Sequence, residues 1–154
     1  MALGGWSIDS LLYDWILNNL DSNKIILELG SGDGTIELLK NWTVYSIEED
    51  ENFVNLHHQN YIHAPIINDW YDTTKFVNLP EKVDLILVDG PANAKRIGFF
   101  NNLELFIKLK PSFLIFDDVD REDDYDCYKK VLETIQFKET GIIKDNKKFA
   151  YIKL

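Results

Sequence analysis

The chain has 154 residues, the size of one domain, and 45% of them are hydrophobic, enough to bury a core. Acidic residues outnumber basic ones by 26 to 16, so the formal net charge of −10 should repel phosphate backbones and argues against nucleic acid as a partner. No apolar run approaches the roughly 20 residues of a membrane-spanning helix, and the start lacks a secretory pattern, so we expect no membrane insertion and a cytoplasmic protein.

Strand-like and helix-like segments alternate along the chain. A first helix is expected after an N-cap at Ser7, because apolar residues recur with helical spacing between 11 and 20. Strands are then predicted at 24–29, 43–47, 61–67, 83–88 and 112–116, and helices at 34–40 and 51–59. The tail, 137–154, is typical of a β-hairpin. This order predicts an α/β fold over residues 1–154, with a mostly parallel sheet, helices on both faces and an antiparallel C-terminal hairpin.

Acidic residues lie at the end of every predicted parallel strand. They are Glu28, Glu48, Asp69, Asp89, Asp117 and Asp118. Open parallel sheets bind ligands at the carboxyl ends of their strands, so we expect these side chains along one edge. The first strand also ends in a glycine-rich loop, but the dinucleotide-binding pattern would require glycine at the sixth loop position, where this chain has Thr35.

The loop ELGSGDG, from Glu28 to Gly34, resembles the E-x-G-x-G-x-G motif of class I S-adenosylmethionine-dependent methyltransferases. The resemblance covers nearly the whole chain. The stretches SIDSLLYDWIL, LVDGPANAKRIGFFNNLELF and LKPSFLIFDDVDRED are similar to those of small methyltransferases associated with glycan or polysaccharide synthesis. This resemblance implies a Rossmann-like methyltransferase fold with a seven-stranded sheet, S-adenosyl-L-methionine as cofactor, and a small-molecule or glycan acceptor.

The same resemblance implies a set of cofactor-binding residues. Glu28 would receive the methionine ammonium group, Glu48 the ribose hydroxyls, and Asp69 with Trp70 the adenine. Glu48 follows Gly30 by 18 positions, close to the spacing of about 20 at which an acidic residue binds a ribose. The full set is Glu28, Gly30, Ser31, Gly32, Gly34, Glu48, Asp69, Trp70 and Asp89. The alternatives are a helix cap for Asp69 and a core aromatic for Trp70.

Three aspartates are candidates for the chemistry. Asp89, Asp117 and Asp118 resemble the ligand set of catechol-type, magnesium-dependent O-methyltransferases. Three carboxylates in one pocket repel one another unless a cation or a shared proton compensates, and oxygen ligands suit Mg²⁺. We therefore predict a metal site at all three, with Asp89 and Asp118 catalytic; the alternative is that Asp117 or Asp118 caps a helix and Asp89 contacts cofactor or acceptor. The lysine that catechol-type enzymes place three residues after the first aspartate is replaced by Ala92.

Polar residues beside these aspartates favour a polar acceptor. They are Asn93, Lys95, Arg96, Asp120 and Arg121. Such a wall suits a sugar hydroxyl better than a planar aromatic molecule. Farther along the chain, Lys144, Lys147 and Lys148 are interpreted as solvated turn residues.

The preferred function is therefore O-methylation of a polar small molecule or glycan. The alternatives are an N-methyltransferase, an aminopropyl transferase, or a non-catalytic subunit that binds S-adenosylmethionine, and the oligomeric state is left open.

Overall fold

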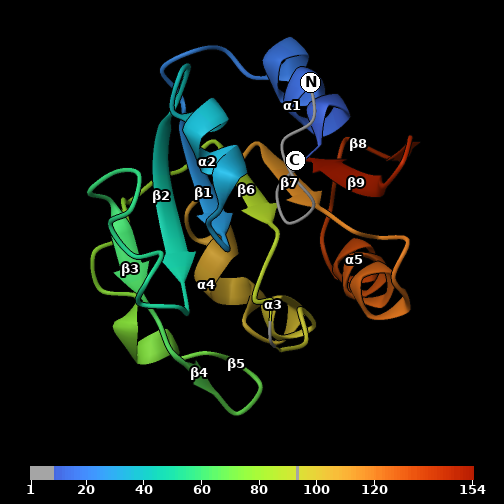
Figure 1. Ribbon diagram of the computed structural model, residues 1–154. Coiled ribbons are helices and arrows are strands. Elements are labelled where there is room, and N and C mark those ends of the chain that lie inside the picture. The colour runs from blue at the N-terminus through green and yellow to red at the C-terminus, as the bar shows by residue number, and fades with distance from the viewer. Residues whose placement is uncertain (1–8, 93) are drawn as a thin grey trace.

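The computed structural model describes residues 9–92 and 94–154, which form a seven-stranded sheet with helices on both sides (Figure 1). The strands of this sheet are β1 (Ile25–Leu29), β2 (Thr43–Glu48), β3 (Tyr61–His63), β6 (Leu85–Val88), β7 (Phe113–Phe116), β8 (Glu139–Lys144) and β9 (Lys148–Lys153). A separate ribbon consists of β4 (Ile66–Ile67) and β5 (Trp70–Tyr71). The helices are α1 (Ser10–Asn19), α2 (Asp33–Leu38), α3 (Gly98–Asn101), α4 (Leu103–Ile107) and α5 (Glu122–Thr134), with a 3₁₀ turn, η1 (Thr73–Lys75).

The strand order is β3-β2-β1-β6-β7-β9-β8. Strands β3, β2, β1, β6 and β7 are parallel to one another, whereas β9 runs antiparallel to β7 and pairs with β8 as a hairpin. Every residue of β6 and β7 is buried, as expected for central strands covered on both faces. The predicted α/β architecture, including the C-terminal hairpin, is confirmed.

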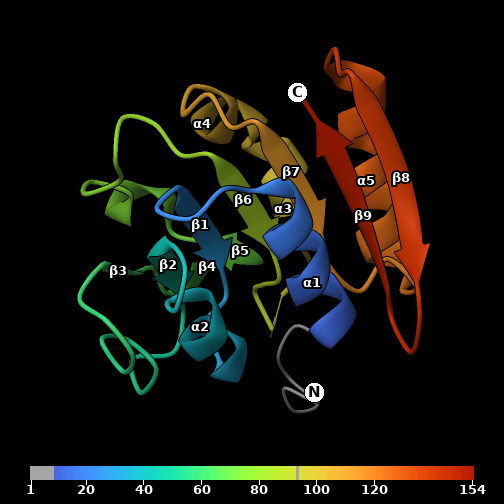
Figure 2. The ribbon, with the colours of Figure 1, turned by 90° about the horizontal axis from the view of Figure 1, so that it is seen from above.

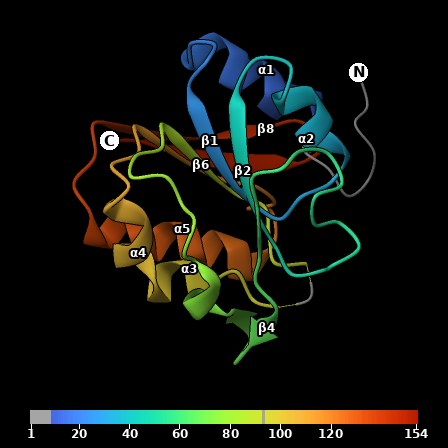
Figure 3. The same ribbon diagram turned by 90° about the vertical axis from the view of Figure 1, so that its left-hand side faces the viewer.

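Two helical layers cover the sheet (Figure 3): α1 and α2 lie on one face, and α3, α4 and α5 on the other. Neighbouring strand residues point to opposite faces, so Ile26 packs in the core beneath α1 while Leu27 packs in the core that contains Phe99 and Phe106. Seen from above, α5 lies along the hairpin, where the Tyr128 hydroxyl is 2.7 Å from Thr140 Oγ1 (Figure 2). No helix within 9–92 or 94–154 is long and apolar enough to cross a membrane.

Helix α1 begins where the sequence predicts, but with a different cap. The Asp9 carboxylate accepts a hydrogen bond of 2.9 Å from the Leu12 amide, which satisfies one free N–H of the first turn. The predicted cap, Ser7, lies outside the described residues.

The helix predicted at 51–59 is wrong. Turns replace it, and Asn55 has a φ of 60°, in the left-handed region that an α-helix does not admit. The Asp50 carboxylate accepts from the Asn52 amide at 2.9 Å, a local bond that favours a turn over a helix. Phe53 and Leu56, two large apolar residues of this stretch, are exposed.

The strand predicted at 61–67 is only partly correct. Strand β3 stops at His63, and β4 then pairs antiparallel with β5 instead of extending the main sheet. The connecting residues Asn68 and Asp69 have φ values of 54° and 67°, which is the conformation of a tight hairpin turn and one that asparagine and aspartate tolerate. Asp69 and Trp70 therefore belong to this ribbon and not to the end of the third strand.

Candidate functional site

A cavity of about 440 Å³ lies at the carboxyl ends of β1, β2 and β6. Its lining residues are Gly30, Ser31, Gly32, Asp33, Glu48, Glu49, Asp50, Phe53, Tyr71, Asp89 and Ala92. Five of these are predicted cofactor residues: Gly30, Ser31, Gly32, Glu48 and Asp89. The structure thus brings together, at one edge, groups that are up to 59 positions apart in the sequence.

Gly30 and Gly90 are needed because β1 and β6 end very close together. Gly30 has a φ of 91°, and a Cβ added there would lie 2.8 Å from the Asp89 carbonyl oxygen. A Cβ on Gly90 would lie 3.0 Å from the Gly30 Cα. Gly32 is extended, with a φ of −170°, which any residue adopts. The steric requirement in the predicted loop therefore falls on Gly30, and Gly90, outside that loop, shares it.

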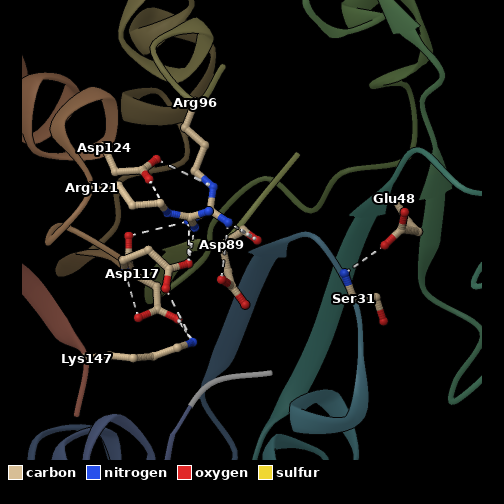
Figure 4. A network of polar contacts seen from close by, with 9 residues as sticks. Ser31, Glu48, Asp89, Arg96, Asp117, Arg121, Asp124 and Lys147 are labelled. Carbon is tan, nitrogen blue, oxygen red and sulfur yellow. Dashed lines mark hydrogen bonds and ion pairs between the residues drawn. The ribbon is translucent and has the colours of Figure 1, made fainter. Parts of the chain in front are cut away.

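Glu48 joins the two loops that border the cavity. Its Oε1 accepts from the Ser31 amide at 2.9 Å (Figure 4), and its Oε2 accepts from the Asp50 amide at 2.8 Å. Burial raises the pKa of Glu48, and these backbone donors oppose the rise. Each carboxylate oxygen keeps a further lone pair, so Glu48 can also accept hydrogen bonds from ligand hydroxyls.

Glu28 lies beneath the glycine loop and does not line the cavity. Its Oε2 accepts from Thr35 Oγ1 at 2.7 Å and from Ser46 Oγ at 2.5 Å. Burial raises the pKa of Glu28 to about 7 against the opposing effect of these hydroxyls. The Ser31 hydroxyl extends the network, 3.1 Å from Thr35 Oγ1. Glu28 supports the loop from below, and its contact with a methionine ammonium group stays a prediction.

The placement of Asp69 and Trp70 does not support their predicted contact with adenine. Asp69 is exposed in the turn between β4 and β5, and neither residue lines the cavity. Trp70 is buried and packs over Gly98, where an added Cβ would lie 2.1 Å from the indole ring. It is a core aromatic, the alternative weighed for it. The next residue, Tyr71, lines the cavity instead, and the only sequence signal for it is the strand alternation that turns neighbouring side chains to opposite sides.

Asp89, Asp117 and Asp118 do converge: one oxygen of each lies within 4.8 Å of the others. Arg96, which is 8% exposed, reaches into this group (Figure 4). Its Nη1 is 3.0 Å from Asp118 Oδ2, its Nη2 is 3.6 Å from Asp89 Oδ1, and its Nε is 3.6 Å from Asp124 Oδ1. A single guanidinium therefore links the ends of β6 and β7 with the first turn of α5.

Lys147 corrects the interpretation of the C-terminal lysines as solvated. Its Nζ is 3.3 Å from Asp118 Oδ1 and 3.7 Å from Asp117 Oδ2, because the β8–β9 turn folds back toward the end of β7. No sequence signal marks it, since the contact joins residues 29 and 30 positions apart. The cation that the three aspartates require is present within the chain.

The three carboxyl groups differ in their pKa values. Burial and the nearby Asp117 raise the pKa of Asp89 well above its ordinary value, and burial and Asp118 raise that of Asp117 to about 6. Burial acts in the same direction on Asp118, but Arg96 and Lys147 hold its pKa below the ordinary value. The surroundings therefore favour the protonated form of Asp89 and Asp117 and the ionised form of Asp118.

A second cavity, of about 270 Å³, adjoins the first through Ala92, which lines both. Its other lining residues are Pro91, Ala94, Lys95, Arg96, Arg121, Glu122, Asp123 and Asp124. Three members of the predicted polar wall, Lys95, Arg96 and Arg121, are thus present. Asp120 does not line this cavity, and Asn93 lies outside the described residues.

Several solved structures that share this fold are described as methyltransferases. The METTL16 MTase domain has a TM-score of 0.59 and 12% identity, over 92% of this chain and 63% of that one. Streptococcus pneumoniae Sp1610, described as a candidate tRNA (m1A22) methyltransferase and solved with S-adenosyl-L-methionine, has a TM-score of 0.55 and 20% identity, over 95% and 72%. M. capricolum TrmK, bound to S-adenosyl-homocysteine, has a TM-score of 0.54 and 11% identity, over 93% and 66%.

These similarities establish the fold as the Rossmann-like methyltransferase fold. The chain spans less than two thirds of the length of the METTL16 domain. No family model matches the sequence, and no curated protein matches it.

The exclusion of nucleic acid, which we based on net charge, is wrong. It is overturned by a neighbour of the same fold described as acting on tRNA. The formal charge of −10 assumes that every carboxyl group is ionised, but the pKa values of Glu28, Asp89 and Asp117 are raised, to about 7 for Glu28 and about 6 for Asp117. An average over the whole chain also says little about the surface beside one cavity.

Proposed function

We propose that this chain is an S-adenosylmethionine-dependent methyltransferase whose cofactor binds in the cavity at the glycine loop. The observation that carries the proposal is the cavity itself, which the loop from Gly30 to Gly32 borders and the carboxylate of Glu48 faces. A loop with two glycines admits a ligand close to the main chain, and a carboxylate opposite it suits ribose hydroxyls. The residues present fit the cofactor.

In this proposal the chain mainly positions the reactants. S-adenosylmethionine supplies an electrophilic methyl group on a sulfonium centre. Gly30 and Ser31 provide the surface beneath the ligand, and Glu48 accepts hydrogen bonds from its hydroxyls while remaining fixed by two backbone amides. The acceptor occupies the second cavity, where Ala92 borders both ligands and leaves room for them to meet.

A hydroxyl acceptor must lose its proton as the new bond to the methyl carbon forms. Asp89 lines the cofactor cavity and lies beside Asp117, whose pKa is raised to about 6. A carboxyl pair with raised pKa values can accept a proton near neutral pH, which is the range in which a general base is most effective. Asp118, with its lowered pKa, is better suited to holding Arg96 and Lys147 than to taking a proton.

The predicted magnesium ion has weak support. The oxygen donors of Asp89, Asp117 and Asp118 would suit a hard cation. However, Arg96 and Lys147 already lie 3.0 and 3.3 Å from Asp118, so a further cation would have to compete with them. No step of the proposed reaction depends on a metal.

The acceptor that the second cavity favours is a hydroxyl of a polar molecule, because charged and polar side chains line it. A second candidate is a nucleotide in RNA, supported by the description of the neighbour Sp1610 as a candidate tRNA methyltransferase. The two differ in the atom that receives the methyl group, an oxygen in the first case and a base nitrogen in the second.

The test is a binding measurement followed by a transfer assay. Calorimetry should detect S-adenosylhomocysteine binding to the purified protein, and methyl-labelled cofactor should label one of three acceptor pools: free sugars and glycans, catechols, or tRNA. Label on a hydroxyl supports O-methylation, and label on a nitrogen identifies an N-methyltransferase. Binding without transfer would support the non-catalytic subunit. Transfer of label only from decarboxylated cofactor that is labelled in its aminopropyl group would support the aminopropyl transferase. No binding would refute the proposal.

A further inference from the structure

Tyr71 is a cavity residue with an unused hydrogen-bonding group. Its hydroxyl has no hydrogen-bond partner among the residues that the structure describes, although the side chain is only 3% exposed. Buried polar groups are nearly always paired, and leaving one unpaired destabilises the folded state. Tyr71 also lines the cavity in which the cofactor is proposed to bind. A ligand in that cavity can supply the missing partner.

The hydroxyl lies at the point where β1 and β6 end. A Cβ added to Gly90 would be 2.4 Å from the Tyr71 hydroxyl oxygen and 3.0 Å from the Gly30 Cα. The hydroxyl therefore occupies space that exists because residue 90 has no side chain. It reaches this point from the β4–β5 ribbon, outside the main sheet, so the ribbon contributes one polar group to the wall of the cavity.

This group can donate a hydrogen bond. Burial, together with the charges of Glu48 and Glu49, raises the pKa of Tyr71 well above its ordinary value, so the phenol keeps its proton. No residue that the structure describes is hydrogen-bonded to it. An oxygen or a nitrogen of the bound ligand can therefore act as the acceptor.

We propose that Tyr71 is a positioning residue for the cofactor, donating a hydrogen bond from its hydroxyl to an oxygen or nitrogen atom of S-adenosylmethionine in this cavity. The inference rests on the proposed function and adds a contact made by a residue outside the predicted cofactor set, next to Trp70 in the same strand. It also gives the β4–β5 ribbon a role in ligand binding.

The experiment compares two tyrosine-to-phenylalanine variants. In Tyr71→Phe the unpaired hydroxyl is removed, so the ligand-free protein should be as stable as the wild type or more stable, while S-adenosylhomocysteine binds about 3- to 10-fold more weakly. Tyr128→Phe is the matched control, because Tyr128 is equally buried but its hydroxyl lies 2.7 Å from Thr140 Oγ1, away from the cavity. It should lower the melting temperature and leave the affinity unchanged.

Calorimetry gives the affinities, and thermal unfolding without ligand gives the stabilities. Equal affinity of Tyr71→Phe and wild type would overturn the inference. A loss of ligand-free stability in Tyr71→Phe as large as in Tyr128→Phe would also overturn it, because the hydroxyl would then have a partner within the protein. If the wild type does not bind S-adenosylhomocysteine, the proposed function fails first, and the two failures are thereby distinguished.

Discussion

The two sides of the candidate site compensate negative charge in different ways. On the side formed by the ends of β1 and β2, Glu48 is held by two backbone amides from nearby loops. On the side formed by the ends of β6 and β7, Asp89 and Asp118 are held by the side chains of Arg96 and Lys147, the latter from the distant hairpin. Backbone donors leave a carboxylate available to a neutral ligand, whereas cationic side chains tie several elements into one charged network.

This difference predicts that the charged side contributes more to stability and the glycine-loop side more to ligand binding. Each of the following experiments changes one side, and the effects are expected to decrease in the order given.

Replacing Arg96 by alanine should cause the largest loss of stability. It would leave Asp89, Asp118 and Asp124 without their buried guanidinium, at a cost of about 3 to 5 kcal/mol in the free energy of unfolding. The matched control is Arg121→Ala, since Arg121 pairs with Asp118 and Asp124 but is largely exposed, and should cost less than about 1 kcal/mol. Urea unfolding measures both; similar losses would show that Arg96 is not the center of the network.

Replacing Glu28 by glutamine should change how stability depends on pH. The folded-state pKa of Glu28 is raised from 4.5 to about 7, so its contribution is fully present below pH 4.5 and is lost as the pH rises through about 7. Between pH 4.5 and a pH above 7, the free energy of unfolding of the wild type should therefore fall by about 3 kcal/mol relative to that of Glu28→Gln. Unfolding at pH 4.5, 6 and 8 checks it, and parallel pH profiles would contradict the raised pKa.

Replacing Glu48 by alanine should weaken S-adenosylhomocysteine binding by about 1 to 3 kcal/mol, because buried ligand hydroxyls would lose their acceptor. Glu51→Ala is the control, since Glu51 is exposed near the same loop and does not line the cavity. Calorimetry on both variants measures the effect. Unchanged affinity in Glu48→Ala would remove this carboxylate from the ligand-binding surface.

Removing metal ions should have the smallest effect. Because Lys147 and Arg96 already compensate Asp117 and Asp118, excess EDTA is expected to change neither the melting temperature nor methyl transfer. In Lys147→Gln, one of these cations is gone, and added Mg²⁺ should then raise the melting temperature more than it does in the wild type. Activity that EDTA abolishes and Mg²⁺ restores in the wild type would reinstate the metal site.

Local sequence was sufficient for most of the fold. Apolar runs and the alternation of strands and helices predicted β1, β2, β6, β7 and the C-terminal hairpin within a few residues. They did so because burial on two faces demands continuous apolar strands. The prediction of a helix at 51–59 failed because the Asp50 side chain and the left-handed Asn55 favour turns there.

For the site, the sequence by itself determined what lies within one loop or at a strand end: the requirement for glycine at Gly30, and the positions of Glu48 and the three aspartates. Tertiary structure decided which groups meet them. Lys147 comes from the hairpin and Tyr71 from the β4–β5 ribbon; no local signal marks the approach of Lys147, and strand alternation alone does not place Tyr71 in the cavity. The physical reason is that backbone conformation follows from neighbouring residues, whereas the charge and hydrogen bonds around a side chain depend on elements that only the packed fold brings together.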